Sequence, residues 1–265
     1  MSLAMPKPNP VVTWLLCTNQ AEFLLWRAID SCLCQTFSDF ELLIITNGPG
    51  AETIERQIKE RYKSDDRVNV IASDIRMLNF NLSLGVLKAR GKYIARMDAD
   101  DVSVPERLAS QVAFMDTHPE VIVLGSSYEL VDGCGILYGR VNRPCTDSEI
   151  RKMLFYSNPF CHPSVMLRRN PIANAGAYLG GRNAEDYDLW CRLCLEYPEG
   201  SIFANLSEPL VHYNVNPSGP ARRSREAYSN VVACQVHAFL MTGHWRWLIG
   251  SILTVGKLMF RSRRK

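Results

Sequence analysis

The chain has 265 residues, of which 47% are hydrophobic and 22% charged, and its formal net charge is +3 at pH 7. This length and composition fit one large α/β domain or two small ones, with ample apolar material for a core. They argue against a disordered chain, and so small a net charge gives no reason to expect a nucleic-acid partner.

The cysteines give no sign of a disulfide framework or a complete metal site. Their number, nine, is odd, and their spacing differs from that of a small secreted domain. Cys191 and Cys194 are spaced like half of a zinc site, but no second pair follows. We therefore expect reduced, mostly buried thiols, as in the cytosol. Residues 1–10 lack the basic and apolar regions of a signal peptide, so a flexible lead-in is expected there.

The first half of the chain alternates apolar runs with helical patterns. Strands are expected at 11–16, 41–46, 68–71 and 92–97, with helices between them at 21–34, 51–63 and 78–90. Three successive β-then-α units predict a Rossmann-like parallel sheet with right-handed crossovers. Ligands of such sheets bind beyond the carboxyl ends of the strands. Asn19, Asn47 and an acidic cluster at Asp98 fall at those ends, so this half is expected to hold a site.

The second half mixes helices with hairpin-like strands. Ser103, Pro105 and Glu106 predict a helix that runs to about residue 115, and strands are expected at 121–124 and 129–131. Thr146 and Glu149 form a predicted capping box for a helix that runs through residue 155. Asn183 is expected to cap a helix at 184–196, and Glu185 and Asp186 lie in its first turn. This half is expected to complete the site rather than to fold alone.

The stretch YIARMDADD (93–101) ends an apolar strand with three carboxylates in four residues. Side chains two apart on a strand share a face, so Asp98 and Asp100 are expected to point the same way. Two oxygen ligands of this kind suit Mg²⁺ or Mn²⁺ held jointly with a phosphate group. An EF-hand is a poor match, because position six of the loop is Ser103 and position twelve is Ala109. The alternative is that the acids only cap the next helix, a role expected for Asp101.

Four segments together resemble the family 2 glycosyltransferases, which have the GT-A fold and act in bacterial surface-polysaccharide synthesis. The resemblance covers residues 10–217, and the segments are ELLIITNGPG, KYIARMDADDVSVPERLASQVAFM, NPFCHPSVMLRR and AEDYDLWCRL. It implies an α/β fold with a Rossmann-type mixed sheet flanked by helices. Residues 1–220 would form the GT-A domain, with a nucleotide-sugar-binding half at 10–125 and an acceptor and catalytic half at 126–220. Residues 221–265 would form a C-terminal helical, basic segment.

The resemblance also implies roles for individual residues. Asp98 and Asp100 would hold Mn²⁺ or Mg²⁺ on the diphosphate of a nucleotide-sugar donor, since a metal stabilises the charge of that leaving group. Asp186 would be the base that deprotonates the acceptor hydroxyl, with Glu185 as a nearby orienter or acceptor contact. One base and no second nucleophile would fit a single displacement with inversion. Further contacts to the donor or leaving group are expected from these residues: Asn19, Thr46, Asn47, Arg96 and His162.

This chain departs from the family pattern in two places. Thr46 and Asn47 stand where acids that contact the nucleotide base are usual. The identity of the donor's nucleotide base is therefore not predicted. The family's Tyr-Arg-x-His pattern appears as YNVN from Tyr213, so Asn216 is either a weaker oxygen ligand or a mark of a depleted metal site. His212 precedes Tyr213 on a strand and is expected to point the other way.

The last segment suggests contact with a membrane surface. Residues 221–240 are expected to form a helical connector, and residues 245–260 are apolar, begin with two tryptophans and precede the basic sequence RSRRK. The apolar run is shorter than the ~20 residues of a spanning helix and is interrupted by Arg246 and Lys257. Tryptophans and basic residues suit the headgroup region of an anionic leaflet, so 245–265 is a candidate membrane-binding segment. A final core helix with a solvated basic end is the alternative.

These features predict a metal-dependent glycosyltransferase that moves a sugar from a nucleotide-sugar to a glycan or lipid-linked acceptor. It would be cytoplasmic, either free or peripheral on the inner face of the cell membrane. A sugar-nucleotide nucleotidyltransferase is one alternative, disfavoured because no glycine-rich loop with Arg and Lys follows the first strand. A nucleotide-binding homologue with weak or lost turnover is the other, motivated by Asn47 and Asn216.

Overall fold

The structure is a computed structural model that describes residues 9–215 and 224–262, with side chains as far as residue 260. A short 3₁₀ turn spans His162–Ser164. In chain order the helices and strands are β1 (Val12–Thr18), α1 (Phe23–Leu33), β2 (Phe40–Asn47), α2 (Ala51–Arg61), β3 (Val68–Ser73), α3 (Leu78–Lys88), β4 (Tyr93–Asp98), β5 (Val102–Ser103), α4 (Arg107–Thr117), β6 (Val123–Val131), β7 (Leu137–Val141), α5 (Asp147–Leu154), β8 (Met166–Arg168), α6 (Arg169–Asn174), α7 (Glu185–Glu196), β9 (Phe203–Asn214), α8 (Arg225–Thr242) and α9 (Trp245–Ser262).

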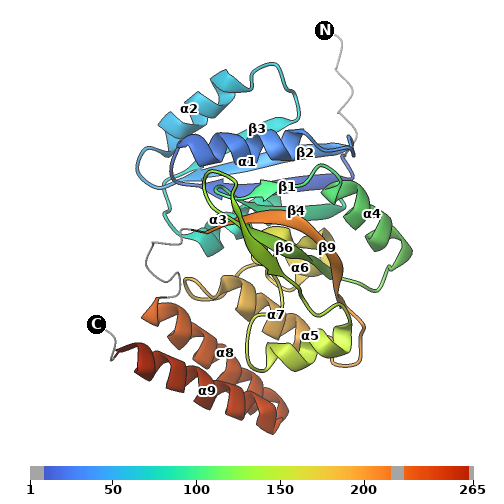
Figure 1. The fold of residues 1–265 in the computed structure, drawn as a ribbon, viewed down its shortest axis with the longest axis vertical. Coiled ribbons are helices and arrows are strands. Elements are labelled where there is room, and N and C mark those ends of the chain that lie inside the picture. The colour runs from blue at the N-terminus through green and yellow to red at the C-terminus, as the bar shows by residue number, and fades with distance from the viewer. Residues whose placement is uncertain (1–8, 216–223, 263–265) are drawn as a thin grey trace.

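One mixed sheet runs through the molecule (Figure 1). Its strand order is β3-β2-β1-β4-β8-β6-β9-β5, and β7 forms a hairpin with β6. The first four strands are parallel, as the βα repeats predict, and β8 pairs antiparallel with β4 and β6. The two strands predicted at 121–124 and 129–131 are parts of one strand, β6, apart from the two residues before it. This strand also crosses residue 125, the expected boundary between the nucleotide-sugar-binding half and the acceptor half. The two expected halves therefore share one sheet.

Side-chain alternation along the strands builds a core on each face of the sheet. On β1, Trp14 and Leu16 pack with apolar residues of α1, α2 and α4, whereas Leu15 packs on the other face with residues of α3, α5 and α7. All three side chains are fully buried. Burial on both faces explains why the parallel strands read as continuous apolar runs.

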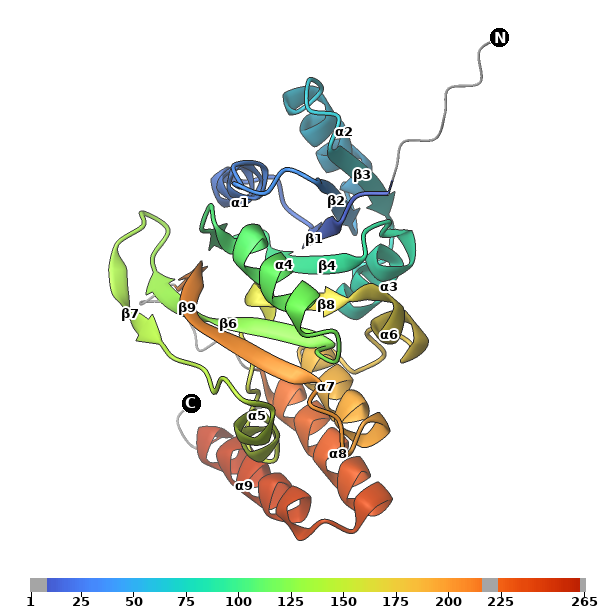
Figure 2. The ribbon, with the colours of Figure 1, turned by 90° about the vertical axis from the view of Figure 1, so that its right-hand side faces the viewer.

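The last two helices form an antiparallel pair that packs against α5 and α7, below the sheet in Figure 2. The approach is close, because a Cβ at Gly250 of α9 would lie 1.9 Å from the carbonyl oxygen of Phe155. Gln235 of α8 donates to that carbonyl oxygen at 3.0 Å and to the hydroxyl oxygen of Tyr187 at 3.2 Å. The pair is thus fixed to the sheet-bearing part of the molecule. No helix within 9–215 and 224–262 has the length and apolarity needed to cross a bilayer.

Two predicted helix starts differ from the structure. The capping box at Thr146 is confirmed, with both reciprocal hydrogen bonds present. The helix expected from Ser103 begins instead at Arg107, because Val102 and Ser103 pair with β9 as the short strand β5. Its N-terminal cap comes from the loop after α1, where Gln35 Oε1 accepts a hydrogen bond from the backbone N–H of Leu108.

Asp101 and Asn183 do not cap helices. The carboxylate of Asp101 accepts a 2.7 Å hydrogen bond from the backbone N–H of Asn214. This bond fastens the end of β9 to the turn after β4 that contains Asp98, Asp100 and Asp101, called the acidic turn below. Asn183 lies one residue before the helix-capping position of Ala184, with φ of 60°, a left-handed conformation that Asn tolerates better than most residues. Both predictions were wrong because a tertiary contact or a turn conformation took precedence over the local pattern.

Arg107 supports the acidic turn from below. Its guanidinium is fully buried and donates to the carbonyl oxygens of Arg96 and Pro163, each at 2.8 Å. It also donates to Gln111 and lies 4.7 Å from the centroid of the Trp14 ring. Burial lowers the pKa of Arg107 to about 10, so it stays charged at neutral pH. This residue connects α4 to β4 and to the 3₁₀ turn.

We expect Arg107→Ala to lower the free energy of unfolding by about 3–5 kcal/mol, since it leaves buried carbonyl groups unsatisfied and opens a cavity. Urea unfolding followed by circular dichroism measures the loss. Arg56→Ala, at an exposed arginine of α2, is the matched control and should change stability by less than about 0.5 kcal/mol. Equal effects of the two substitutions would contradict the supporting role.

Candidate active site

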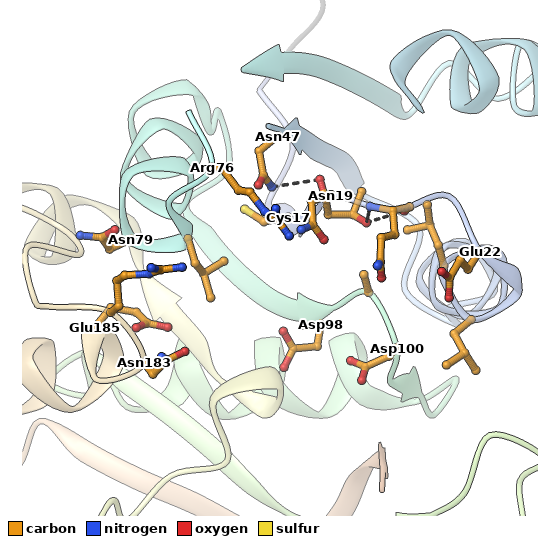
Figure 3. A pocket seen from close by; sticks show the side chains of 17 residues that line it. Cys17, Asn19, Glu22, Asn47, Arg76, Asn79, Asp98, Asp100, Asn183 and Glu185 are labelled. Atoms are coloured by element: carbon orange, nitrogen blue, oxygen red, sulfur yellow. Dashed lines mark hydrogen bonds between the residues drawn. The ribbon is translucent and has the colours of Figure 1, made fainter. Parts of the chain in front are cut away.

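A polar pocket of about 500 Å³ opens at the carboxyl ends of the parallel strands. Its lining comes from the ends of β1, β2 and β4, the segment after β3, and the segment before α7. Figure 3 shows that Asn47, Arg76, Asp98, Asp100 and Glu185 reach the pocket from different elements. The location follows the rule that open α/β sheets bind ligands beyond the carboxyl ends of their strands.

The acidic turn after β4 places carboxylates on the floor of this pocket. Asp98 and Asp100 line the pocket and are half-buried, whereas Asp101 is fully buried. One carboxylate oxygen from each of the three lies within 4.8 Å of the others. Asp98 and Asp100 thus offer hard oxygen ligands with open space beside them for water or phosphate oxygens. This donor set fits Mg²⁺ or Mn²⁺.

The positive charge beneath these acids is Arg96, the predicted donor contact. Its side chain is 3% exposed and lies outside the pocket lining. It forms a 2.6 Å ion pair with Asp98. Burial alone would lower the pKa of Arg96, but the Asp98 carboxylate raises it above its usual range. Arg96 is therefore a buried counter-ion of the acidic turn and does not itself line the pocket.

Glu185 and Asp186, at the start of α7, face two different cavities. Glu185 is 6% exposed and lines the 500 Å³ pocket. Its Oε2 has no hydrogen-bond partner among the described residues. Burial, followed by the nearby Asp186 charge, raises the pKa of Glu185. Asp186 lines a second cavity of about 150 Å³, where it accepts hydrogen bonds from Asn158 Nδ2 at 2.5 Å and from the Tyr187 N–H at 2.7 Å.

Sequence comparison identifies the family. Residues 14–175 match the profile described as Glycosyl transferase family 2. The O-antigen biosynthesis glycosyltransferase WbnJ of Escherichia coli is 37% identical over 213 residues, which cover 80% of this chain and 82% of WbnJ. This chain belongs to glycosyl transferase family 2. The amylovoran biosynthesis glycosyltransferase AmsE of Erwinia amylovora is 31% identical over 71% of this chain and 69% of its own length.

Solved glycosyltransferase structures share the fold. S. aureus TarS 1–349 in complex with UDP-GlcNAc superposes with a TM-score of 0.67 and 18% identity over 86% of this chain, and this chain spans 66% of that one. The mannosyltransferase PcManGT of Pyrobaculum calidifontis, in complex with GDP-Man and Mn²⁺, gives a TM-score of 0.64 and 15% identity over 97% of this chain and 76% of its own. The predicted GT-A fold, family membership and glycosyltransferase class are confirmed.

Of the two residues predicted to contact the donor at the end of β2, Asn47 lines the pocket and Thr46 does not. Asn47 lines the pocket beside Asn19, and its Nδ2 donates to the carbonyl oxygen of Thr18 at 2.9 Å. Thr46 is fully buried, and its hydroxyl donates to the carbonyl oxygen of Ala51 at 2.9 Å. The expectation of a donor contact from Thr46 is wrong in this structure, since strand alternation turns that side chain toward α2.

His162, the other residue expected at the leaving group, lines neither cavity. Its Nε2 lies 3.1 Å from the hydroxyl oxygen of Tyr178. Although part of the ring surface is accessible, burial by surrounding protein atoms and the charge of Arg96 lower its pKa well below the usual value. His162 is therefore neutral at pH 7 and contacts Tyr178 outside the lining of both cavities.

Two cationic residues that line the pocket, Arg76 and Arg182, were not among the predicted site residues. Arg76 follows β3 by three residues and Arg182 precedes α7, and both are exposed side chains that line the pocket. A nucleoside diphosphate requires such cations. The only sequence signal for Arg76 was its place after a parallel strand, and Arg182 had none, because the segment before α7 comes to the pocket through the fold.

The other family departures lie at the end of β9. His212 Nε2 lies 3.3 Å from Glu129 Oε2, whereas Tyr213 packs on Tyr128 with ring centroids 5.4 Å apart. The two neighbours point to different surroundings, as strand alternation predicts. Asn216 lies outside the described residues.

The nine cysteines are all free thiols. Burial raises the pKa of both the Cys191 and the Cys194 thiol. Within 9–215 and 224–262, the acidic turn is the cluster of side chains that could hold a metal ion.

We predict that Glu185→Gln raises the melting temperature at pH 7. The folded protein binds a proton at Glu185 more tightly than the unfolded chain does, so the stability that Glu185 contributes is lost as pH rises through its raised pKa. A neutral amide avoids this loss. The advantage should vanish below about pH 4, where the unfolded carboxyl is also protonated.

Thermal unfolding of both proteins across this pH range measures the difference. Asp65→Asn is the control of opposite sign, because Arg67 lowers the pKa of Asp65 and the substitution should therefore destabilise at pH 7. A Glu185→Gln protein with an unchanged melting temperature at every pH would contradict the burial of an unpaired carboxyl.

Proposed function

We propose that the protein is a metal-dependent, inverting glycosyltransferase that moves a sugar from a nucleotide-sugar to a polysaccharide precursor. The observation that carries the proposal is the pair of cavities that meet at the start of α7. One holds the paired carboxylates Asp98 and Asp100, and the other holds Asp186. Nucleotide-sugar complexes of TarS and PcManGT, and the Mn²⁺ in the latter, support the donor class and the metal.

The larger pocket would bind the donor. Asp98 and Asp100 would hold Mn²⁺ or Mg²⁺, which when bound stabilises the charge of the departing nucleoside diphosphate. Arg76 and Arg182 would bind the phosphate oxygens, and Asn47 would contact the nucleotide at the end of β2. Arg96 fixes Asp98 through their ion pair, which holds that carboxylate in place before the donor arrives.

Asp186 would act as the base. Its carboxylate would take the proton of an acceptor hydroxyl as the hydroxyl oxygen attacks the anomeric carbon of the donor sugar. The bond from that carbon to the diphosphate breaks on the opposite side, so the configuration inverts. Asn158 and the Tyr187 N–H orient the Asp186 carboxylate. Glu185, on the donor side of the same turn, would orient the donor sugar.

Relatives in O-antigen and amylovoran biosynthesis support a surface-polysaccharide pathway. The donor is a nucleotide-sugar, so we place the reaction in the cytoplasm, at the inner face of the membrane. Because the chain belongs to a glycosyltransferase family, we do not propose that it is a sugar-nucleotide nucleotidyltransferase. Loss of turnover is decided by the experiment that follows.

Slow hydrolysis of a panel of UDP- and GDP-sugars in the presence of Mn²⁺ tests this function without a known acceptor. We expect one donor to release nucleoside diphosphate. Asp100→Asn should lower this rate by about a hundredfold or more, since it removes a metal ligand. Asp186→Asn should lower transfer by about 10²–10⁴-fold once an acceptor is known.

Asp39→Asn, at an exposed acid at the opposite end of β2, is the control and should hydrolyse the donor at the wild-type rate. The absence of hydrolysis for every donor would leave a binding protein without turnover. An Asp100→Asn protein as active as Asp39→Asn would reject the metal site.

We also propose that α8 and α9 lie on an anionic membrane surface. Their outward side exposes large apolar side chains, including Leu240, Trp245, Ile252, Met259 and Phe260. On α9, Trp245, Ile252 and Met259 recur every seven residues and Phe260 follows Met259, so these four form one apolar stripe along that helix. Soluble monomers rarely leave so large an apolar face uncovered.

The charges of α9 support an anionic lipid as the covering surface. The helix contains no Asp or Glu and carries Arg246 and Lys257 among its described side chains, and the chain ends in the basic sequence RSRRK. On a helix, Arg246 and Lys257 are eleven residues, or about three turns, apart and lie on one flank of the apolar stripe. Cations beside a buried apolar face suit a helix that lies in the headgroup region.

Co-sedimentation with vesicles rich in phosphatidylglycerol tests this surface. The double variant Ile252→Asp/Met259→Asp should reduce the bound fraction by about tenfold or more, because it places charges in the apolar stripe. Deleting α9 is a poor test, since Trp247 and Gly250 pack against the rest of the protein. Leu87→Asp, at an exposed leucine of α3, is the matched control. Equal binding by both variants would reject the membrane proposal.

A further inference from the structure

The 150 Å³ cavity beside Asp186 is built by both the catalytic half and the C-terminal helices. Its walls come from the segment 156–158, the first turn of α7, the first turns of α8, and α9. Asn183 lines this cavity and the donor pocket alike, so the two adjoin. The cavity therefore opens toward the place where the donor's anomeric carbon would lie, with Asp186 in its wall.

The lining of this cavity suits a single sugar ring. Apart from Asp186 and Lys257, its polar side chains carry hydroxyls and amides, and three tyrosines add aromatic surface. The residues that supply these groups include Tyr156, Ser157, Asn158, Tyr228 and Thr254. Hydroxyls and amides can both donate to and accept from sugar hydroxyls. A cavity of about 150 Å³ is close to the size of one monosaccharide.

Lys257 adds a cation to this lining. It lies on α9 with an exposed side chain, and within residues 9–215 and 224–262 no carboxylate forms an ion pair with it. A cation at the mouth of a sugar-sized cavity favours an anionic group attached to the sugar, and phosphate is the group that lysine commonly binds.

The surroundings of Lys257 favour a lipid on the far side of that phosphate. Leu253 and Phe260 lie four residues before and three residues after Lys257, so they are its neighbours on the helix surface. Their side chains are 50% and 73% exposed. A chain that leaves a phosphate bound at Lys257 would thus run directly onto the apolar stripe of α9.

We propose that this cavity is the acceptor subsite, and that it binds one sugar joined through phosphate to a membrane lipid. The sugar hydroxyl meets Asp186, and Lys257 binds the phosphate. This rests on the proposed function, and it adds that the acceptor carries a single sugar, because a longer glycan would separate the phosphate from the cavity. The reaction that supplies this acceptor must therefore attach the first sugar to a lipid phosphate.

Calorimetric binding of citronellyl diphosphate, a short prenyl diphosphate, tests the phosphate contact. EDTA is included so that a metal in the donor pocket does not bind the probe. Lys257→Ala should weaken binding about tenfold, since one charge-assisted contact is lost, and Lys257→Arg should restore most of it. Lys88→Ala, at an exposed lysine of α3, is the matched control and should bind like the wild type.

Two further probes separate the possible sources of the phosphate. Inorganic diphosphate should bind more weakly than citronellyl diphosphate, and citronellyl glucoside, which lacks phosphate, should show no dependence on Lys257. Binding that is equal for Lys257→Ala and Lys88→Ala, or equal for the inorganic and the prenyl diphosphate, would overturn the inference. Wild-type donor hydrolysis is measured in parallel, since its absence would reject the proposed function independently of this result.

Discussion

The ion pair between the buried Arg96 and the half-buried Asp98 is the interaction on which the arrangement of the site depends. Three carboxylates within one turn repel one another, and a guanidinium beneath them offsets that repulsion. Arg107 in turn donates to the carbonyl oxygen of Arg96, and Asp101 holds the end of β9. The acidic turn is thus fixed by a buried polar network, which leaves Asp98 and Asp100 directed into the pocket. A site prepared in this way avoids reorganising when a diphosphate and its metal bind.

Two adjacent acids at the start of α7 have different surroundings. Successive residues of a helix point about 100° apart, so Glu185 and Asp186 face different cavities without any special backbone. The larger pocket receives the buried carboxyl of Glu185, whose pKa is raised, and the second cavity receives the Asp186 carboxylate, which accepts hydrogen bonds from Asn158 and the Tyr187 N–H. The C-terminal helices line that second cavity, so a segment whose sequence suggests contact with a membrane surface also forms a wall of the proposed acceptor site.

Much of the fold follows from local patterns, whereas the fine structure of the site depends on distant contacts. The βα repeats predicted the parallel strands, and strand alternation predicted that Asp98 and Asp100 would face one pocket. Alternation also explains why Thr46 turns away although Asn47 does not. Sequence reasoning could not show that Asp101 would bind Asn214, more than one hundred residues later. Nor could it show that Arg96 would pair with Asp98 rather than with the donor, because both outcomes fit an arginine two residues before an acid.

The position of Mn²⁺ in crystals grown with Mn²⁺ and a nucleoside diphosphate tests the central claim most directly. Anomalous scattering locates the ion independently of the protein phases. The account predicts a peak within ligand distance of Asp98 and Asp100, on the Glu185 side of the start of α7, with the Arg96–Asp98 pair intact. A peak in the cavity of Asp186, or no peak at the acidic turn, would contradict it.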